Sequence, residues 1–413
     1  MQICHLLITL FLCILPSVEI VNASGPEKKI SFLKARELIL SENPGLKSSE
    51  TLIEAAKEGV LQADVQPNPS VDYSLDKLGA NEIEITIEQS IELGGKRKYR
   101  KEAAEREVEL ALNSCDYTRL ELEAEILRRF IPVITVQKKL ALLDSMIDIA
   151  EITREEIKRR FEEGARRKTD LVRAEIDIEQ LKLEHSELES DAIVSRKKFA
   201  SLGAKSQKLL MNVTGTISEN IEIPTLEEIR ERLQLNLLLK AVDIEQQQFE
   251  TFQRQLGAEA IPDLNVYAGY LRDNKEKSNS PLVGLSMTIP IFNRNKAAQR
   301  QVWLKGQALQ QKRQNLLSII DADAQEIHSR LLAIENQIKM LTTSIIPKSE
   351  NVYTMMQEYY SSGNVEYLDL SETQAEVLRS IMKLYDIQAE MAQKLTDLMQ
   401  ISNIPLQIVK SEE

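Results

Sequence analysis

The fold of this chain is decided by two short stretches, SIELGGKR at residues 90–97 and IPIFNRNK at residues 289–296. Each stretch follows a segment in which apolar and polar residues alternate, and each opens a long polar segment with helical spacing. Strict alternation over about four to eight residues is typical of a β-strand, whereas apolar residues every three or four positions are typical of a helix. Each stretch therefore marks a change from strand to helix.

The two stretches belong to a duplication of the chain. Leu93 and Phe292 are 199 residues apart, and the same distance separates Gly164 from Gly363. Both glycines open a Gly-x5-Asp-Leu turn, so the spacing between the helix start and the turn is kept in both halves. We therefore expect a leader and two structural repeats, over residues 1–23, 24–202 and 203–413.

Each repeat is predicted to hold a helix, two short strands and a long helical hairpin, in that order. In the first repeat the helix is expected at about 47–65, the strands at about 70–76 and 82–90, and the hairpin at about 96–201. In the second repeat they are expected at about 226–257, 263–271 and 282–291, and 296–400. Residues 79–81 suit a tight turn, whereas residues 272–281 read as a longer polar loop.

The composition favours long elements with few turns. A typical chain holds roughly 7% Gly and 5% Pro, so 14 Gly and 12 Pro in 413 residues are about half of the expected number. Between Lys96 and Phe161 the only breaker is Pro132, and a continuous helix of that length extends on the order of 100 Å. Because Pro usually kinks or breaks a helix, bends are expected at Pro132 and at Pro347.

Several classes of function are excluded by composition and motif. The net charge of −12 argues against a nucleic-acid partner. The GGKR motif lacks the spacing of a phosphate-binding loop, and no pattern of nucleophile and base is present, so an enzyme is not expected. His185 and His328 lie on separate predicted helices without the spacing of metal ligands. We therefore expect no metal site and no cofactor.

The N-terminus resembles a secretory signal. Residues 6–18 form an apolar run of 13 residues, which is shorter than the roughly 20 that a spanning helix needs. Val21-Asn22-Ala23 follows as a small-residue cleavage site; a membrane anchor is the alternative. Removal of residues 1–23 would leave Cys115 as the only cysteine. No later apolar run approaches 18 residues, so a membrane crossing would have to use strands.

Assembly is suggested by the last helix and by the number of strands. The last helix has two apolar seams, one through Leu378 and Met399 and the other through Val377 and Leu398. Two seams require a neighbour on each side, as in a closed ring of helices or in an ordinary bundle. Four strands cannot close a membrane barrel, which has about 8 or more. Three copies would supply 12 strands and 12 helices.

The chain resembles the TolC family of outer-membrane efflux proteins over essentially all of its mature length. The motifs that carry the resemblance are QPNP at 66–69, IELGGKR at 91–97, IPIFNRN at 289–295 and the two Gly-x5-Asp-Leu turns. The pair of long motifs is most similar to the cobalt-zinc-cadmium (Czc-type) branch. Two residues depart from the pattern of that branch. Ser90 stands where the branch commonly has Pro, and Pro132 lies within the first long helix.

The resemblance implies a mainly α protein with a small membrane β part. It would form a homotrimer with a 12-stranded β-barrel in the outer-membrane lipid and a 12-helix α-barrel in the periplasm. Its implied role is a passive duct for divalent heavy metals. It would work with a periplasmic adaptor (membrane fusion) protein and a proton-driven inner-membrane pump of the resistance-nodulation-division type. A duct for drugs or secreted polypeptides shares this architecture, and a periplasmic coiled-coil adaptor, which needs no strand pairs, is the further alternative.

Candidate site residues lie at the hairpin turns and at the changes from strand to helix. The tips would dock the adaptor through Gly164, Gly363, Asp170, Leu171 and Leu370. Oppositely charged residues at the tips are candidates for closing the entrance: Arg166, Arg167, Lys168, Glu366, Asp369 and Glu372. The chain would turn from strand to helix at Gly94, Gly95 and Asn293. For Asp170 and Asp369 the simpler role is to bind free backbone N–H groups at a helix start. The second hypothesis is that three copies of Asp369, together with Glu366 or Glu372, form an acidic ring that favours cations at the entrance.

Overall fold

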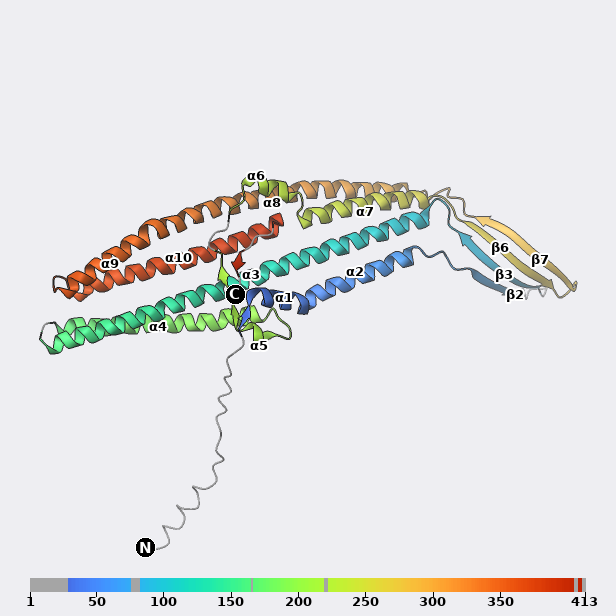
Figure 1. Cartoon of the computed structure of the whole chain (residues 1–413). Coiled ribbons are helices and arrows are strands. Elements are labelled where there is room, and N and C mark those ends of the chain that lie inside the picture. The colour runs from blue at the N-terminus through green and yellow to red at the C-terminus, as the bar shows by residue number, and fades with distance from the viewer. Residues whose placement is uncertain (1–28, 76–81, 165, 219–221, 405–407, 411–413) are drawn as a thin grey trace, which may run out of the picture.

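A computed structural model describes residues 29–75, 82–164, 166–218, 222–404 and 408–410 of the chain. The expected leader (1–23) and the expected turn at 79–81 lie outside these residues. The molecule is a long rod of helices with a β-sheet at one end and two helical hairpin turns at the other (Figure 1). Short helices and strands gather around the middle of the rod, close to the C-terminus.

The sheet joins the two halves of the chain. Its four strands are antiparallel in the order β2-β3-β6-β7. The central pairing runs from Glu82 opposite Asp273 to Ile91 opposite Leu264, so β3 and β6 pair over their whole length. The strands span β2 Ser70–Leu75, β3 Glu82–Ile91, β6 Leu264–Asp273 and β7 Ser278–Met287.

The second hairpin is tighter than the sequence suggested. Residues 272–281 were expected to be a loop, with a strand over 282–291, but β7 begins at Ser278 and ends at Met287. The Asp273 carboxylate accepts hydrogen bonds from the backbone N–H groups of Lys275 and Glu276, at 2.7 and 3.1 Å. Lys277 has a φ of 49°. Because the turn is short, the polar residues at the start of β7 pair with β6 through backbone hydrogen bonds. Their sequence lacks the alternation of apolar and polar residues that would have predicted a strand.

The register separates an apolar face of the sheet from a polar one. Opposite pairs such as Val71 with Ile87 and Val266 with Leu285 share the same face, because side chains alternate along each strand. The apolar face extends over all four strands: Val71, Tyr73, Leu75, Ile83, Ile85, Ile87, Leu264, Val266, Ala268, Tyr270, Val283, Leu285 and Met287. The other face carries the carboxylates: Asp72, Glu82, Glu84, Glu88 and Asp273. Such a sheet fits between an apolar and an aqueous environment.

The helices run along the rod. In the first half they span α1 Phe32–Glu42, α2 Pro44–Ala63, α3 Lys96–Glu162, α4 Lys168–Ala200 and α5 Gln207–Leu210. In the second half they span α6 Leu226–Leu233, α7 Leu237–Glu259, α8 Lys296–Met340, the π-helical turn η1 Leu341–Ile345, α9 Ile346–Ser361 and α10 Tyr367–Ser402. Near the middle, two short parallel strands pair, β1 Ile30–Ser31 with β4 Val213–Thr214, and two antiparallel ones pair, β5 Thr216–Ile217 with β8 Val409–Lys410.

A helix expected over 226–257 is two helices, α6 and α7. The break follows from Asn236, whose side-chain oxygen accepts hydrogen bonds from the backbone N–H groups of Leu238 and Leu239, at 2.9 and 3.3 Å. Asn at this position starts a new helix because it satisfies N–H groups that have no partner within the helix.

The two prolines inside the long helices behave differently. α3 continues through Pro132 as a single helix of 67 residues, where Phe130, Ile131 and Val133 are buried and packing supports the helix. Before Pro347 the chain instead forms the π-helical turn η1. Proline removes one helical hydrogen bond and crowds the carbonyl four residues earlier, and a local π turn is one way to accommodate this.

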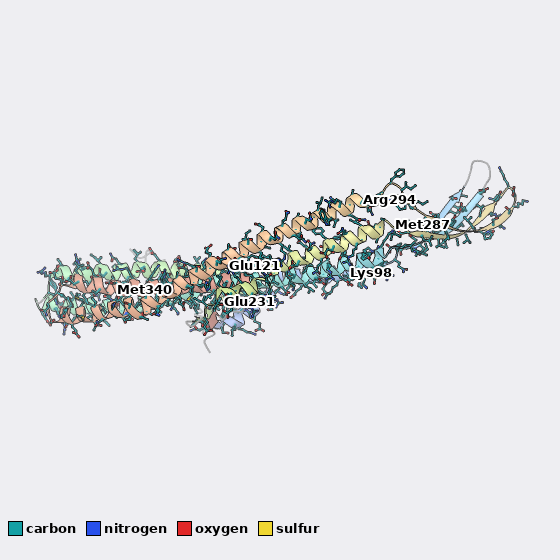
Figure 2. The ribbon with its side chains drawn as sticks, turned by 90° about the horizontal axis from the view of Figure 1, so that it is seen from above. Lys98, Glu121, Glu231, Met287, Arg294 and Met340 are labelled. Carbon is teal, nitrogen blue, oxygen red and sulfur yellow. The ribbon has the colours of Figure 1, made fainter. Side chains whose placement is uncertain are left out.

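The main core lies where the rod is thickest. The Phe130 ring packs against Phe32 and Phe199, with ring centres 4.5 and 5.6 Å apart. α10 contacts α3 on one side and α8 and α9 on the other, as its two apolar seams predicted. Side chains cover the whole rod in Figure 2, where Met287 and Arg294 mark the sheet end and Met340 lies toward the hairpin tips.

We predict that Gly94→Ala destabilises the protein more than Gly164→Ala. Both glycines have a left-handed φ, 74° and 76°, so each substitution should cost about 1–2 kcal/mol in backbone strain. A Cβ at Gly94 would also lie 2.8 Å from Ile261 Cδ1 and 3.0 Å from the Ala258 carbonyl, whereas nothing lies within 4 Å at Gly164. Overpacking should add about 1–3 kcal/mol at Gly94.

The measurement is the midpoint of thermal unfolding of the detergent-solubilised protein. Equal shifts for the two variants would contradict the close packing at Gly94.

Candidate functional site at the hairpin tips

The two hairpin turns lie together at the end of the rod opposite the sheet (Figure 1). Gly164 follows α3 with a φ of 76°, and Gly363 follows α9 with a φ of 82°. Their N–H groups donate to the carbonyls of Phe161 and Tyr360, at 2.9 and 3.1 Å. Glycine ends a helix in this way because the left-handed conformation costs it little.

Beneath the turns, four helices share a small buried cluster, which we call the tip cluster. It consists of Ile157 from α3, Ala174 from α4, Tyr360 from α9, and Tyr367 and Leu370 from α10. The rings of the two tyrosines meet edge to face with centres 6.2 Å apart, and Leu171 packs against the cluster. Burial raises the pKa of both phenols, and for Tyr367 the nearby Asp177 raises it further. Both side chains are therefore neutral at physiological pH.

Arg166 holds the first tip against the second. Its guanidinium carbon lies 4.2 Å from the centre of the Tyr360 ring, which is a cation–π distance. The same group donates to the carbonyl of Tyr360 at 2.6 Å and to that of Val365 at 3.3 Å. One side chain from the first hairpin thus engages both the ring and the backbone of the second.

The other charged tip residues make weaker contacts. Arg167 Nη1 pairs with Glu366 Oε1 at 3.1 Å, and both side chains are exposed. Glu366 precedes α10 and forms a capping box with Asp369, whose Oδ2 accepts from the Glu366 N–H at 3.3 Å. Asp170 occupies the corresponding position in the first turn of α4, where no side-chain cap is formed. Opposite charges of the two tips therefore meet within one chain.

The space between the hairpins is hollow in two places. A cavity of about 470 Å³ lies between α3, α4 and α10, with Asp177, Glu184, Glu372 and Arg379 in its wall. The Asp177 Oδ2 atom is buried and has no hydrogen-bond partner among the residues described. A groove of about 500 Å³ lies nearer the tips and is lined by Lys168, Thr169, Asp170, Val172, Arg173, Ile176, Glu366 and Leu368. Four of the predicted tip residues, Lys168, Asp170, Glu366 and Glu372, thus line these two hollows.

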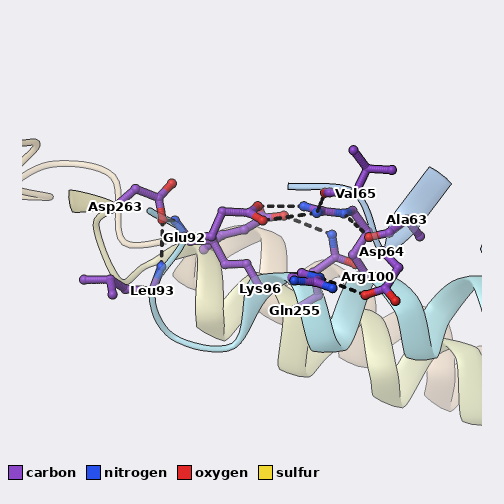
Figure 3. Close-up of polar contacts among 11 residues, drawn as sticks. Ala63, Asp64, Val65, Glu92, Leu93, Lys96, Arg100, Gln255 and Asp263 are labelled. Atoms are coloured by element: carbon purple, nitrogen blue, oxygen red, sulfur yellow. Dashed lines mark hydrogen bonds and ion pairs between the residues drawn. The ribbon is translucent and has the colours of Figure 1, made fainter. Parts of the chain in front are cut away.

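At the opposite end, α3 is fixed to both halves of the chain by what we call the first junction, residues 92–101 (Figure 3). Gly94 and Gly95 have φ values of 74° and 76°. Asp263, next to β6, accepts from the Leu93 N–H at 3.1 Å and from Lys96 Nζ at 2.7 Å. Arg100 binds Glu92 at 2.7 and 3.1 Å and also donates to two carbonyl groups at the end of α2.

Further ion pairs complete the first junction. Asp64 binds Arg97 and Lys101 at 2.8 and 3.0 Å. Hydrogen bonds from these two cations lower the pKa of the Asp64 carboxyl. The four cations of the first junction that face α2 and β6, Lys96, Arg97, Arg100 and Lys101, therefore each have a carboxylate partner.

The second change from strand to helix, at residues 288–296, has a different geometry. Here the left-handed residue is Asn295, with a φ of 55°, at the position that precedes α8 as Gly95 precedes α3. The predicted turn residue, Asn293, accepts a hydrogen bond from the Asn295 N–H at 3.1 Å. Asn replaces Gly here because its short polar side chain tolerates the left-handed region.

Tyr360, Tyr367 and Asp177 were not among the predicted site residues. The available signal was the position of the two tyrosines, three residues before and four residues after Gly363. In the part of the chain that the structure covers, no three His, Cys, Asp or Glu side chains are grouped to hold a metal ion. His185 instead contacts Asp144 at 3.0 Å. No described helix combines the length and the apolar character needed to cross a bilayer.

Comparisons with known proteins agree on one family. The outer membrane efflux protein family matches residues 35–202 and 229–403. The cobalt-zinc-cadmium resistance protein CzcC of Cupriavidus metallidurans is 23% identical over 388 residues, which are 91% of this chain and 90% of that protein.

Solved structures show the same fold. A membrane protein from Pseudomonas aeruginosa superimposes with a TM-score of 0.73 at 17% identity, covering 90% of this chain and 92% of its own. The outer membrane channel CmeC of Campylobacter jejuni gives 0.71 at 15% identity, covering 90% and 85%.

We predict that Arg166→Gln loosens the tips, whereas Arg167→Gln leaves them almost unchanged. The first substitution removes a cation–π contact and two charge-assisted hydrogen bonds, worth about 1–3 kcal/mol together. The second removes an exposed pair, worth about 0–1 kcal/mol. Amide hydrogen exchange over residues 363–367 should accelerate in the first variant only. Equal exchange in both would argue against a structural role for Arg166.

Proposed function

This chain belongs to the outer membrane efflux protein family, and on that premise we propose that it is the outer-membrane duct of a tripartite efflux system for divalent heavy metals. Members of the family are located in the outer membrane and extend into the periplasm. The observation that carries the proposal is the four-stranded sheet, with one apolar face, one acidic face and two open edges.

Three copies are proposed because one sheet cannot close. β2 and β7 are the edge strands, and each uses only one side for pairing within the described residues. Unpaired backbone groups at a strand edge are costly in lipid. Pairing β7 of one copy with β2 of the next would satisfy these groups, and three copies give 12 strands, within the range of known membrane barrels.

The helices near the sheet support the same assembly. α8 exposes Arg300 and Lys305 close to the sheet end, whereas α2 exposes Glu54 and Glu58 at a comparable distance from it. If β7 pairs with β2 of the next copy, α8 lies beside that copy's α2. The basic face would then meet the acidic one, and the helices would form a closed wall around a tunnel.

Divalent metal cations are the proposed cargo. CzcC, by its printed name a cobalt-zinc-cadmium resistance protein, is similar to this chain along most of its length. The acidic face of the sheet would line the exit, and Asp72, Glu84 and Glu88 would favour cations there. Drugs or secreted polypeptides are the alternative cargo, because a duct for them would have the same architecture.

The hairpin tips are the proposed inner end of the duct. An adaptor would dock around Gly164, Gly363, Asp170, Leu171 and Leu370, and the inner-membrane pump would supply the energy. The charged residues Arg166, Arg167, Lys168, Glu366, Asp369 and Glu372 would line or close the entrance. Asp369 has a structural role in the capping box, and three copies of it would also form an acidic ring.

We predict that Asp369→Asn lowers the cation selectivity of the reconstituted channel. Asn keeps an oxygen that can accept the Glu366 N–H, so the capping contact and the fold should survive while the charge is lost. The measurement is the reversal potential in planar bilayers under a salt gradient. Asp170→Asn is the matched control, since it removes the corresponding charge from the first hairpin. Equal selectivity in all three proteins would sink the acidic-ring hypothesis.

We also predict that a strain without this gene loses tolerance to zinc, cobalt or cadmium, and that the intact gene restores it. The comparison is growth in these metals against growth in detergents and antibiotics. Loss of drug tolerance alone would refute the metal cargo and favour the alternative.

A further inference from the structure

The segment that connects β7 to α8, which we call the second junction, exposes an unusual amount of apolar surface. Phe292 is 99% exposed, and Ile289 and Ile291 are 74% and 62% exposed. Leu93, which lies 199 residues before Phe292 in the repeat, is only half-exposed, and its N–H is bound to Asp263. The two junctions therefore differ in what covers them.

The exposed residues continue the apolar face of the sheet. Val283, Leu285 and Met287 alternate along β7 on that face, and Ile289 and Ile291 follow at the same two-residue spacing. Val283 and Leu285 are 78% and 68% exposed. A stripe of apolar residues thus continues in sequence from Val283 past the end of β7 to Phe292, although the chain is no longer a strand there and the Ile291 N–H donates to the Ile289 carbonyl at 3.0 Å.

Cations follow the stripe directly. Arg294 and Lys296 are exposed, and neither forms an ion pair with a carboxylate among the described residues. In the first junction, by contrast, Lys96 and Arg97 each bind a carboxylate within 2.8 Å. Figure 2 shows Lys98 and Arg294 on opposite edges of the rod.

We propose that the second junction is a lipid-binding anchor. Phe292 and Ile291 insert at the periplasmic surface of the outer membrane, while Arg294 and Lys296 bind the phosphates of anionic phospholipid headgroups. The inference rests on the proposed function, in which the apolar face of the sheet contacts lipid. Aromatic side chains favour the boundary of a bilayer, and adjacent Lys and Arg side chains favour anionic headgroups.

The order of residues fits the change of environment along this axis. From the sheet toward the helices, the chain presents aliphatic side chains, then an aromatic ring, then two cations. The hydrocarbon core, the boundary and the headgroup layer follow one another in the same order. Asp64, Glu92 and Asp263 bind four of the five cations of the first junction, whereas Arg294 and Lys296 lack a carboxylate partner among the described residues, so we assign the anchor to the second repeat alone, once per copy.

The experiment uses tryptophan as a reporter of lipid contact. Trp303 is the only tryptophan of the chain, so Trp303→Phe gives a silent background. Into this background we would introduce Phe292→Trp, Leu93→Trp as the matched site in the first junction, and Val283→Trp on the apolar face of the sheet. Each full-length protein is reconstituted into vesicles that contain phosphatidylcholine and phosphatidylglycerol brominated on their acyl chains.

We expect the brominated lipids to quench the fluorescence of the Phe292→Trp protein strongly and that of the Leu93→Trp protein little. Quenching at 283 without quenching at 292 would overturn the anchor and leave the proposed function standing. This outcome, with blue-shifted emission from 292 in detergent, would indicate that a neighbouring copy covers the segment. Absence of quenching at both 283 and 292 would overturn the lipid-facing orientation as well.

The headgroup preference is tested separately. Vesicles carry bromine either on phosphatidylglycerol or on phosphatidylcholine, and the ratio of the two quenching efficiencies is measured at position 292. The ratio should exceed one and should fall toward one in the Arg294→Gln/Lys296→Gln variant. Lys98→Gln, which removes an exposed cation from the first junction, should leave it unchanged. A ratio of one in the Trp303→Phe/Phe292→Trp protein with Arg294 and Lys296 intact would refute binding of anionic headgroups.

Discussion

The structure depends on a four-stranded sheet whose edge strands, β2 and β7, each have backbone N–H and C=O groups without a partner strand among the described residues. Backbone groups in that state need a partner or water. Apolar side chains such as Ile87 and Leu285 are exposed on one face of the sheet, and a contiguous apolar face of this kind needs an apolar environment or a partner to cover it. In the proposed assembly, a single chain would therefore supply only part of a closed wall, and the helices that continue the strands would need neighbouring copies in the same way.

The two junctions connect the strands of the sheet to the helices of the rod, so they determine how the rod is oriented relative to the sheet. At the first junction, Asp263 from the second half binds the start of α3, while Arg100 binds the end of α2. These contacts fix the strand and the helix of both halves in one arrangement. The second junction has no such network among the described residues, so its orientation depends more on what surrounds the chain. The two strand-to-helix connections therefore both follow a β-hairpin and differ in the contacts that fix them.

Sequence patterns predicted the elements that carry a local signal. Alternation of Ile and Glu indicated β3, and Gly at positions 164 and 363 indicated the turns. The start of β7 was missed because Ser278, Asn279 and Ser280 pair through their backbone and show no apolar periodicity. The tip cluster was missed for another reason: Ile157, Ala174 and Tyr360 are far apart in sequence, and only the packing of two hairpins brings them together.

The tips combine contacts of very different strength, and this limits how they can move. The tip cluster and Arg166 join four helices of one chain through buried rings and charge-assisted hydrogen bonds. The pair of Arg167 with Glu366 is exposed, and such pairs contribute little. A motion that keeps the cluster whole therefore costs less than one that separates α4 from α10. The two hairpins of one chain should consequently move together as a rigid unit. In the proposed assembly, a change in the width of the entrance should therefore arise from movement of neighbouring copies relative to one another.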